Sequence, residues 1–192
     1  CFVCAMARQM RALSAAIYGG LPSIRPEESL RRTVRERCAC YNVDVVAFCR
    51  GLCMSWQDIA ELSSDPLCAI GAHTVNHMIL KKVSSEATVR AEMEMSRAVL
   101  EAALGKRPEH LAFPVGDVTS AGAREFRIAS ELGFKTALTT RPGVLFKVHR
   151  DYLTALPRIS VNGEFQRQRY LKVLMSGAGT AISNRFRRLS VA

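Results

Sequence analysis

Residues 111–139 read LAFPVGDVTSAGAREFRIASELGFKTALT, and this stretch decides the fold class. Two short apolar runs, 111–113 and 134–139, stand on either side of a segment, 120–132, whose apolar residues recur at helical spacing. A strand, a helix and a second strand in this order are typical of a parallel sheet, because a parallel pair of strands needs a long crossover connection. The stretch therefore predicts an α/β fold.

The alternation of strands and helices continues on both sides of this stretch. Upstream, 67–70 reads as a short strand, and a long amphipathic helix is expected over about 85–104. Downstream, 141–143 is expected to turn the chain into a further strand at 156–161. The whole region is thus expected to form a parallel sheet covered by helices.

The two ends of the chain are predicted to be helical. Before residue 56 the apolar spacing predicts helices with no strand between them, and after residue 165 basic residues accompany an apolar helical face. The sequence therefore predicts a helical segment, a strand–helix domain and a basic helical tail, which span residues 1–55, 56–165 and 166–192.

A pair of histidines follows the predicted strand at 67–70. In Ile70-Gly71-Ala72-His73-Thr74-Val75-Asn76-His77 the two imidazoles stand at positions i and i+4. Neutral imidazoles at this spacing can face one metal ion, and histidine is a common ligand of catalytic zinc. The alternative is a loop or helix that carries two histidines by chance. Their place just past a strand end favours the metal interpretation, because α/β folds build active sites there.

Four segments in register resemble the polysaccharide deacetylase family, in particular its nodulation-type chitooligosaccharide deacetylase branch. In chain order they are 73–77, 111–117, 134–140 and 156–161, and the likeness runs over about 56–165, with a looser likeness on both flanks. The resemblance implies a partial (β/α) barrel. It also implies a hydrolase that removes N-acetyl groups from N-acetylglucosamine-containing oligosaccharides or polysaccharides with a divalent metal, expected to be zinc.

The resemblance assigns the parts of an active site to particular residues. His73 and His77 match the two metal-binding histidines of the family. Val115 matches the residue whose backbone N–H binds the oxyanion.

Other matched residues belong to the substrate side of the resemblance. Phe113, Pro114 and Leu156 match the positions that line the sugar site. Arg158 lies in the stretch where many members place a histidine general acid, so it is the candidate for that catalytic position.

The family's first motif, Thr-Phe-Asp-Asp-Gly, does not occur in these 192 residues. Its aspartates supply the general base and the third metal ligand. The chain also begins at Cys1 rather than at methionine, so we expect a barrel that lacks its first strand or strands and a poor deacetylase on its own. Asp117 is the nearest substitute carboxylate, although a turn or cap before Thr119 is the favoured interpretation.

Two further functions remain open on the sequence alone. A catalytically inactive remnant would act only as a carbohydrate-binding or interaction module. A basic adaptor is the other, because the formal net charge is +10 and arginines cluster at 31–37 and 185–188. No nucleic-acid motif accompanies these clusters, so solvated helix faces are favoured and no nucleic-acid partner is expected. The basic tail leaves peripheral membrane contact as an alternative.

Composition indicates a folded protein of a reducing compartment. A chain of 192 residues with 48% hydrophobic residues can bury a core. Seven cysteines, an odd number, without a recognisable signal peptide favour a cytoplasmic location. The sequence contains no run of about 18 apolar residues, so no transmembrane helix is predicted. Cys49 and Cys53 stand on one apolar helical face, and we expect both to be buried.

Overall fold

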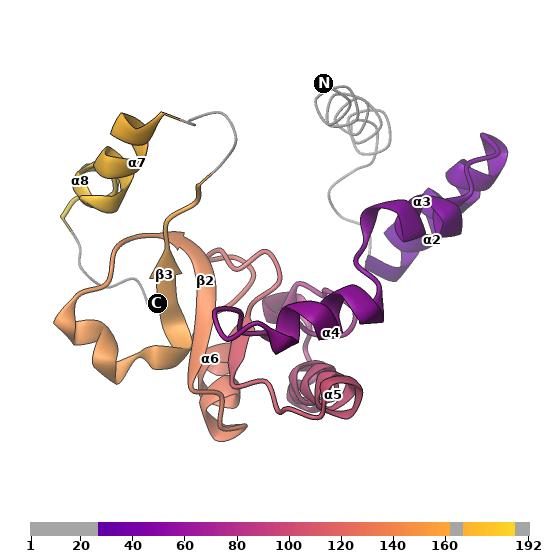
Figure 1. Ribbon diagram of the computed structural model, residues 1–192, viewed down its shortest axis with the longest axis horizontal. Helices are drawn as coiled ribbons and strands as arrows, with labels where there is room; N and C mark the ends of the chain where they lie inside the picture. Colours follow the sequence, from indigo (N-terminus) through magenta and orange to yellow (C-terminus); the bar gives the residue numbers. More distant parts are fainter. Residues whose placement is uncertain (1–26, 162–166, 187–192) are drawn as a thin grey trace. The chain divides into compact units, whose positions relative to one another are not determined.

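The computed structural model describes residues 27–161 and 167–186 (Figure 1). The chain divides into two compact units, 1–55 and 56–192. Each unit is described by itself below. The helix predicted near the start of the chain lies outside the described residues.

The first unit contains two helices in its described part, α2 (Glu27–Cys40) and α3 (Val45–Leu52). The Asp44 carboxylate begins α3 by accepting hydrogen bonds from the backbone N–H groups of Val46 and Ala47, both at 3.0 Å. A side chain of this kind satisfies N–H groups that have no partner within the helix. The start of α3 is therefore set by one local residue.

The prediction that Cys49 and Cys53 are buried is wrong. Both side chains are exposed free thiols, and α3 contains no buried residue. Two short helices have too little surface to enclose a side chain completely. The apolar helical face in the sequence predicts a core position, but the described part of this unit has no third element to cover it.

The second unit alternates helices and strands, as the sequence predicts. Its elements are α4 (Trp56–Ser64), η1 (Leu80–Lys82), α5 (Glu86–Leu104), β1 (His110–Ala112), α6 (Ala123–Glu131), β2 (Thr136–Pro142), η2 (Lys147–Asp151), η3 (Leu153–Ala155), β3 (Leu156–Arg158), α7 (Gln168–Met175) and α8 (Ala178–Ser183). The two 3₁₀ helices, η2 and η3, fill the connection between β2 and β3.

The three strands form one parallel sheet in the order β1-β2-β3. Figure 1 shows β2 and β3 side by side, with α6 packed beside them. Leu111 pairs with Ala137 across the first strand pair, and Leu138 pairs with Leu156 across the second. A single parallel bridge joins Ala72 to Leu111. It adds the segment that leads into His73 and His77 to the free edge of β1. The predicted α/β fold with a parallel sheet is confirmed.

The strand predicted at 67–70 is not formed. Asp65 holds this segment in a turn, because its side chain accepts from the backbone N–H of Leu67 at 2.8 Å and its carbonyl accepts from Cys68 at 3.0 Å. Pairing begins only at Ala72, whose N–H donates to the carbonyl of His110 at 2.8 Å. The extended conformation therefore starts later than the apolar run suggests.

Strand β2 runs further than predicted. Arg141 and Pro142 belong to the strand rather than to a turn, and Pro142 pairs with Arg158 of β3. The Arg141 side chain is buried, and its guanidinium donates to the carbonyl of Ala121 at 2.8 Å. This long-range bond extends the strand past the point where the local proline signal predicts an end.

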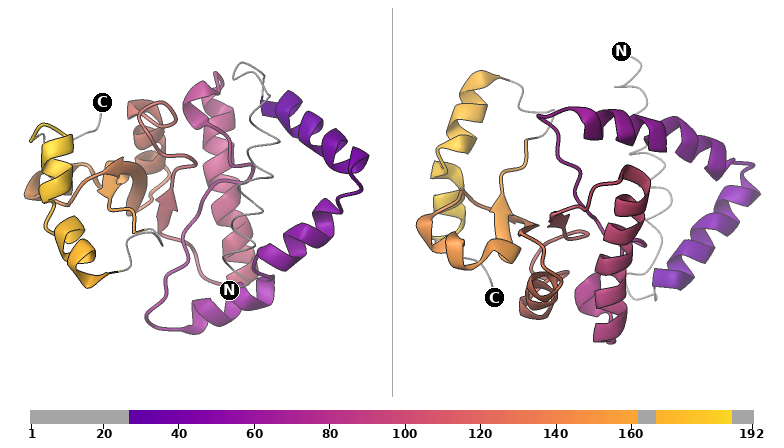
Figure 2. Two further views of the ribbon diagram at one scale, coloured as in Figure 1. Left: turned by 90° about the horizontal axis from the view of Figure 1, so that it is seen from above. Right: turned by 60° about the horizontal axis from the view of Figure 1, so that its bottom comes forward.

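The hydrophobic core lies where the sheet meets the helices. Val89 and Met93 of α5 and Ile128 of α6 are completely buried, together with Leu111 of β1 and Ala137 of β2. Figure 2 shows α5 and α6 as neighbouring helices beside the strands. Complete burial of a valine, leucine, isoleucine or methionine side chain stabilises a fold by about 1.5–3 kcal/mol. The same residues that carry the helical periodicity thus attach both helices to the sheet.

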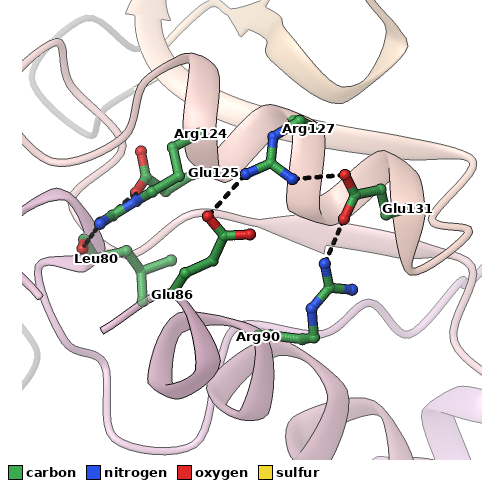
Figure 3. Close-up of polar contacts among 7 residues, drawn as sticks. All are labelled: Leu80, Glu86, Arg90, Arg124, Glu125, Arg127 and Glu131. Atoms are coloured by element: carbon green, nitrogen blue, oxygen red, sulfur yellow. Dashed lines mark hydrogen bonds and ion pairs between the residues drawn. The ribbon is translucent and has the colours of Figure 1, made fainter. Parts of the chain in front are cut away.

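A network of charged side chains joins α5 to α6 on the outside of this core (Figure 3). Arg127 donates to Glu131 at 2.6 Å and to Glu86 at 2.8 Å, and Arg90 pairs with Glu131. The four side chains are between 36% and 50% exposed. Partly solvated pairs of this kind contribute little one by one and more as a network.

The helices α7 and α8 pack on each other after β3, as the two views in Figure 2 show. Asn184, just after α8, donates its side-chain amide to the carbonyl of Pro142 at 2.8 Å and so ties this pair to the end of β2. Among the described residues, no helix is long and apolar enough to cross a membrane.

Candidate active site

The two histidines lie together just beyond the bridge between Ala72 and β1. Their ring centroids are 4.9 Å apart and the planes meet nearly edge to face, at 74°. Both residues are exposed, so solvent and ligands can reach the rings. The structure therefore brings His73 and His77 to one place, at the carboxyl end of the parallel strands where α/β folds bind ligands.

The His73 ring is fixed by the neighbouring strand. Its Nδ1 lies 2.7 Å from the backbone carbonyl of Ala112, the last residue of β1. A carbonyl oxygen can only accept, so Nδ1 carries the proton and the lone pair of the neutral ring lies on Nε2. A histidine that binds a metal through one ring nitrogen characteristically donates the N–H of its other ring nitrogen to an acceptor such as a backbone carbonyl. The ring is thus held with its free nitrogen available.

The loop from His73 to His77, called the histidine loop below, has an unusual backbone. Thr74 and His77 have φ angles of +62° and +52°, in the left-handed region that non-glycine residues rarely occupy. Glu92 of α5 accepts hydrogen bonds from the backbone of Val75 and of Asn76. Such conformations persist only where surrounding contacts hold them, and they cluster at functional sites.

A second tight turn follows β1. Val115 has a φ of +60°, and the N–H of Gly116 donates back to the carbonyl of Pro114 at 2.6 Å. Within the described part of the chain the Val115 N–H has no hydrogen-bond partner, and the residue is 44% exposed. This N–H is therefore available to a ligand.

Thr140 of β2 holds this turn from the side. Its backbone N–H donates to the carbonyl of Gly116 at 2.9 Å, and its hydroxyl donates to the carbonyl of Val115 at 2.7 Å. A Cβ added at Gly116 would lie 2.8 Å from the Thr140 nitrogen, so glycine permits this close approach. Two carbonyls of the turn are thus fixed by one residue of the next strand.

The residues matched to the sugar site lie mostly below the surface. Phe113 is 2% exposed and packs on Phe126, with ring centroids 5.4 Å apart. Pro114 is fully buried, and Leu156 is 8% exposed. Arg158 is exposed at the end of β3. Val115 is therefore the part of the 113–116 segment that faces solvent.

Asp117 is engaged in a local turn. Its carboxylate accepts from the hydroxyl of Thr119 at 2.8 Å and from the backbone N–H of the same residue at 2.9 Å. The Thr119 hydroxyl bond is the main cause that lowers the pKa of Asp117. The favoured interpretation of this residue as a turn former agrees with these contacts, since the carboxylate is held toward its own loop.

A pocket of about 270 Å³ opens beyond the ends of β2 and β3. Its wall is largely apolar and includes Pro142, Val144, Phe146, Pro157 and Phe186. Because parallel strands end at the same edge of a sheet, the pocket and the histidine loop lie at the same end of the strands.

The arrangement fits part of a metal site. It offers two imidazoles, one of them with its second nitrogen on a carbonyl, and a buried Thr74 hydroxyl that has no partner among the described residues. A bound water or ion is one explanation for an orphaned buried polar atom. Within residues 27–161 and 167–186, no group of three or more His, Cys, Asp and Glu side chains could hold a metal ion. The two histidines therefore form an incomplete set of ligands.

Two residues that support the site were not found by sequence analysis. Glu92 had a readable signal, because it is a charged residue on the same face of α5 as Val89 and Met93, both completely buried. Thr140 had none, because its contacts with the turn at Val115 depend on the alignment of two strands. A buried charge on an apolar face is thus the clue that sequence analysis alone could have used.

Several solved structures of deacetylases are similar to this chain. The Streptococcus pyogenes deacetylase PplD in complex with acetate matches with a TM-score of 0.56 and 23% identity, covering 63% of this chain and 50% of that one. A polysaccharide deacetylase from Bacillus cereus matches with a TM-score of 0.54 and 20% identity, covering 63% and 36%. IcaB from Ammonifex degensii matches with a TM-score of 0.50 and 22% identity, covering 65% and 53%. The likeness establishes the fold, that of a partial (β/α) barrel.

The chain spans about a third to about half of the length of these structures. No curated protein sequence matches it significantly. The sequence model of the family described as polysaccharide deacetylase matches residues 33–137, so it starts within α2, on the flank of the likeness expected over about 56–165, and ends within β2. Because this match covers more than half of the 192 residues, the chain belongs to the polysaccharide deacetylase family.

Proposed function

We propose that this chain carries the metal-binding half of a deacetylase that removes N-acetyl groups from N-acetylglucosamine-containing glycans. The observation that carries the proposal is the pair formed by His73 and His77, whose rings lie 4.9 Å apart. The hydrogen bond between His73 and the carbonyl of Ala112 supports it, because it leaves Nε2 as the free ligand atom. Chitooligosaccharide is the proposed substrate class, in keeping with the resemblance to the nodulation-type branch.

His73 and His77 would hold a divalent ion, and zinc is the metal that their nitrogen atoms favour. When bound, such an ion supplies Lewis acidity and lowers the pKa of water toward neutrality. Catalytic zinc sites have three protein ligands, so the third ligand and the general base are expected from an Asp-Asp pair that these 192 residues do not contain.

The Val115 N–H is the proposed donor to the oxygen that gains charge when the amide is attacked. Its N–H is held in a rigid turn by Thr140, and preorganised donors of this kind stabilise a developing oxyanion. Removal of one such donor typically lowers kcat by about 10²–10³-fold. Phe113, Pro114 and Leu156 are buried, so we propose that they support the sugar site from below rather than touch the sugar directly.

Arg158 is exposed at the end of β3, in the stretch where the resemblance places a general acid. A guanidinium stays protonated at neutral pH and cannot exchange a proton with a leaving amine. We therefore propose that Arg158 contributes charge near the substrate rather than a proton.

A zinc titration of the full chain tests the metal role. His73→Ala and His77→Ala are each expected to weaken zinc binding strongly, because one imidazole alone cannot chelate the ion. His110→Ala is the matched control, since the His110 ring contacts the Thr136 hydroxyl at 2.8 Å on the sheet and is not part of the pair. Zinc affinity that is unchanged in His77→Ala would contradict the proposal.

Acetate release from chitooligosaccharide separates the enzyme from a binding module. Because the Asp-Asp pair is absent from the sequence, this chain alone is expected to release little or no acetate, since a missing general base typically lowers a rate by about 10²–10⁴-fold. Efficient release by the isolated chain would contradict this expectation. Oligosaccharide binding that is unchanged by zinc would instead support the alternative, a module that binds carbohydrate without catalysis.

A further inference from the structure

One carboxylate holds the histidine loop from behind. Glu92 lies on α5 and is only 7% exposed. Its Oε2 accepts hydrogen bonds from the backbone N–H groups of Val75 at 3.1 Å and Asn76 at 2.8 Å. Its Oε1 accepts from the side-chain amide of Asn76 at 2.6 Å. All three donors belong to the two residues that lie between Thr74 and His77 in the chain.

The position of Glu92 is unusual for a charged residue. On the inner face of α5 it lies next to Met93 and one turn from Val89, both completely buried. A buried carboxylate is unfavourable unless hydrogen bonds compensate its lost hydration. The partners that the structure gives it are the donors of the histidine loop. The carboxylate of Glu92 is therefore stabilised by donors of the histidine loop, whereas the core residues beside it offer no compensation for its lost hydration.

The loop needs such support. Thr74 and His77, on either side of the residues that Glu92 binds, both have positive φ angles, of +62° and +52°. Backbone of this kind relaxes unless surrounding contacts fix it. If the backbone relaxed at Thr74 or at His77, the two imidazoles would turn away from each other, because these φ angles set the direction in which the chain carries the rings.

We propose that Glu92 is a positioning residue that fixes His73 and His77 in the arrangement that chelates one divalent ion. The inference rests on the proposed metal role of the two histidines. Glu92 does not contact the ion in this proposal. It acts through the backbone of Val75 and Asn76, and its negative charge further favours a cation near the loop.

Zinc affinity of the full chain tests the proposal. Glu92→Gln loses the acceptor for the Asn76 amide, and the zinc dissociation constant is expected to rise about tenfold to hundredfold, the range found when groups that orient metal ligands are removed. Glu94→Gln is the matched control, because it removes the same charge from an exposed position of the same helix and is expected to leave the affinity unchanged.

A double variant distinguishes positioning from general stability. Glu92→Gln combined with Asn76→Asp exchanges donor and acceptor across the bond between these side chains and keeps the net charge of the chain. Zinc affinity is expected to return to within a few-fold of the original. If Glu92→Gln alone does not fold, a folded double variant that binds no zinc overturns the proposal.

The histidine rings give a second readout. The chain has four histidines, so the ring resonances can be assigned from single variants by nuclear magnetic resonance. In metal-free Glu92→Gln the resonances of His73 and His77 are expected to shift, while those of His110 and His149 stay in place. Glu92→Gln with the zinc affinity and ring resonances of the unmodified chain overturns the proposal. If His77→Ala also leaves zinc binding unchanged, the metal role itself fails, which separates the two failures.

Discussion

At the scale of single residues, the candidate site depends on backbone conformations that few side chains tolerate. Gly116 has a φ of +74° and lies against the backbone of Thr140, whereas Gly105, after α5, has a φ of +66° with open space around it. The two glycines therefore share a conformation and differ in their surroundings. This difference allows the close approach at the turn to be measured separately.

Alanine at these two positions is expected to destabilise the protein unequally. Gly105→Ala should lower the free energy of unfolding by about 1–2 kcal/mol, the usual cost of left-handed backbone. Gly116→Ala should lower it by a further 1–3 kcal/mol or so, because its Cβ would lie 2.8 Å from the Thr140 nitrogen and the backbone must move. Urea unfolding measures both values, and equal losses would show that the turn yields without strain.

The sequence predicts these residues to different degrees. The histidine pair is readable, because its residue types and spacing themselves indicate a metal ligand, and Val115 was found only through the family resemblance. The partners that hold them, Glu92 and Thr140, come from other elements, so their roles follow from how α5 and β2 pack. Residues that do the chemistry are thus easier to predict than residues that position them.

At the scale of elements, local signals set the helix ends and long-range contacts set the strand ends. The Ser85 hydroxyl accepts from the N–H of Thr88 at 3.2 Å, and Gly105 ends α5 in the left-handed conformation, so the helix has nearly the bounds of about 85–104 that the sequence predicts. The strand at 67–70 failed because the turn at Asp65 takes its first N–H groups. Capping is decided within a few residues, whereas strand pairing depends on a distant partner.

The contact between α5 and α6 is expected to weaken in acid. The hydrogen bond from Arg127, and to a lesser extent the one from Arg90, lowers the pKa of Glu131 below the ordinary value of a glutamate. A carboxylate whose folded pKa is lowered stabilises the fold above its unfolded pKa, and this contribution is lost as pH falls through the folded pKa. The network shown in Figure 3 should therefore stabilise the protein at neutral pH and lose this contribution as pH falls through the folded pKa of Glu131.

Glu131→Gln tests this pH dependence. At pH 7 the variant is expected to unfold at a lower urea concentration than the original chain, and the difference should shrink as pH falls below about 4.5. Added salt should reduce the difference at pH 7 as well, because the side chains are partly solvated. Glu94→Gln again serves as the control. A difference that stays constant from pH 7 to pH 3 would exclude a role for the carboxylate charge.

At the scale of the whole molecule, the described core belongs to one of the two units. Every buried hydrophobic side chain in the described residues lies between Ala72 and Leu156, within the unit 56–192. The first unit has exposed apolar side chains on α3, including Val46 and Phe48. The stability of the fold is therefore expected to come mainly from the second unit.

A polypeptide of residues 56–192 tests this distribution. It is expected to retain a thermal unfolding transition and the zinc affinity of the full chain, because the core and both histidines are present in it. Circular dichroism and zinc titration of the two polypeptides provide the comparison. Loss of the transition on removing residues 1–55 would show instead that the helical segment completes the fold.

The hydrogen bond between His73 and Ala112 has a consequence for following how the molecule assembles. The imidazole proton on Nδ1 is held by the last carbonyl of β1, so it is protected from solvent only while the histidine segment lies alongside that strand. In proton spectra it should appear as a downfield signal that is absent from His73→Ala, and it should vanish when this edge of the sheet opens. The signal of this one ring proton would thus report when the histidine segment closes onto the edge of β1.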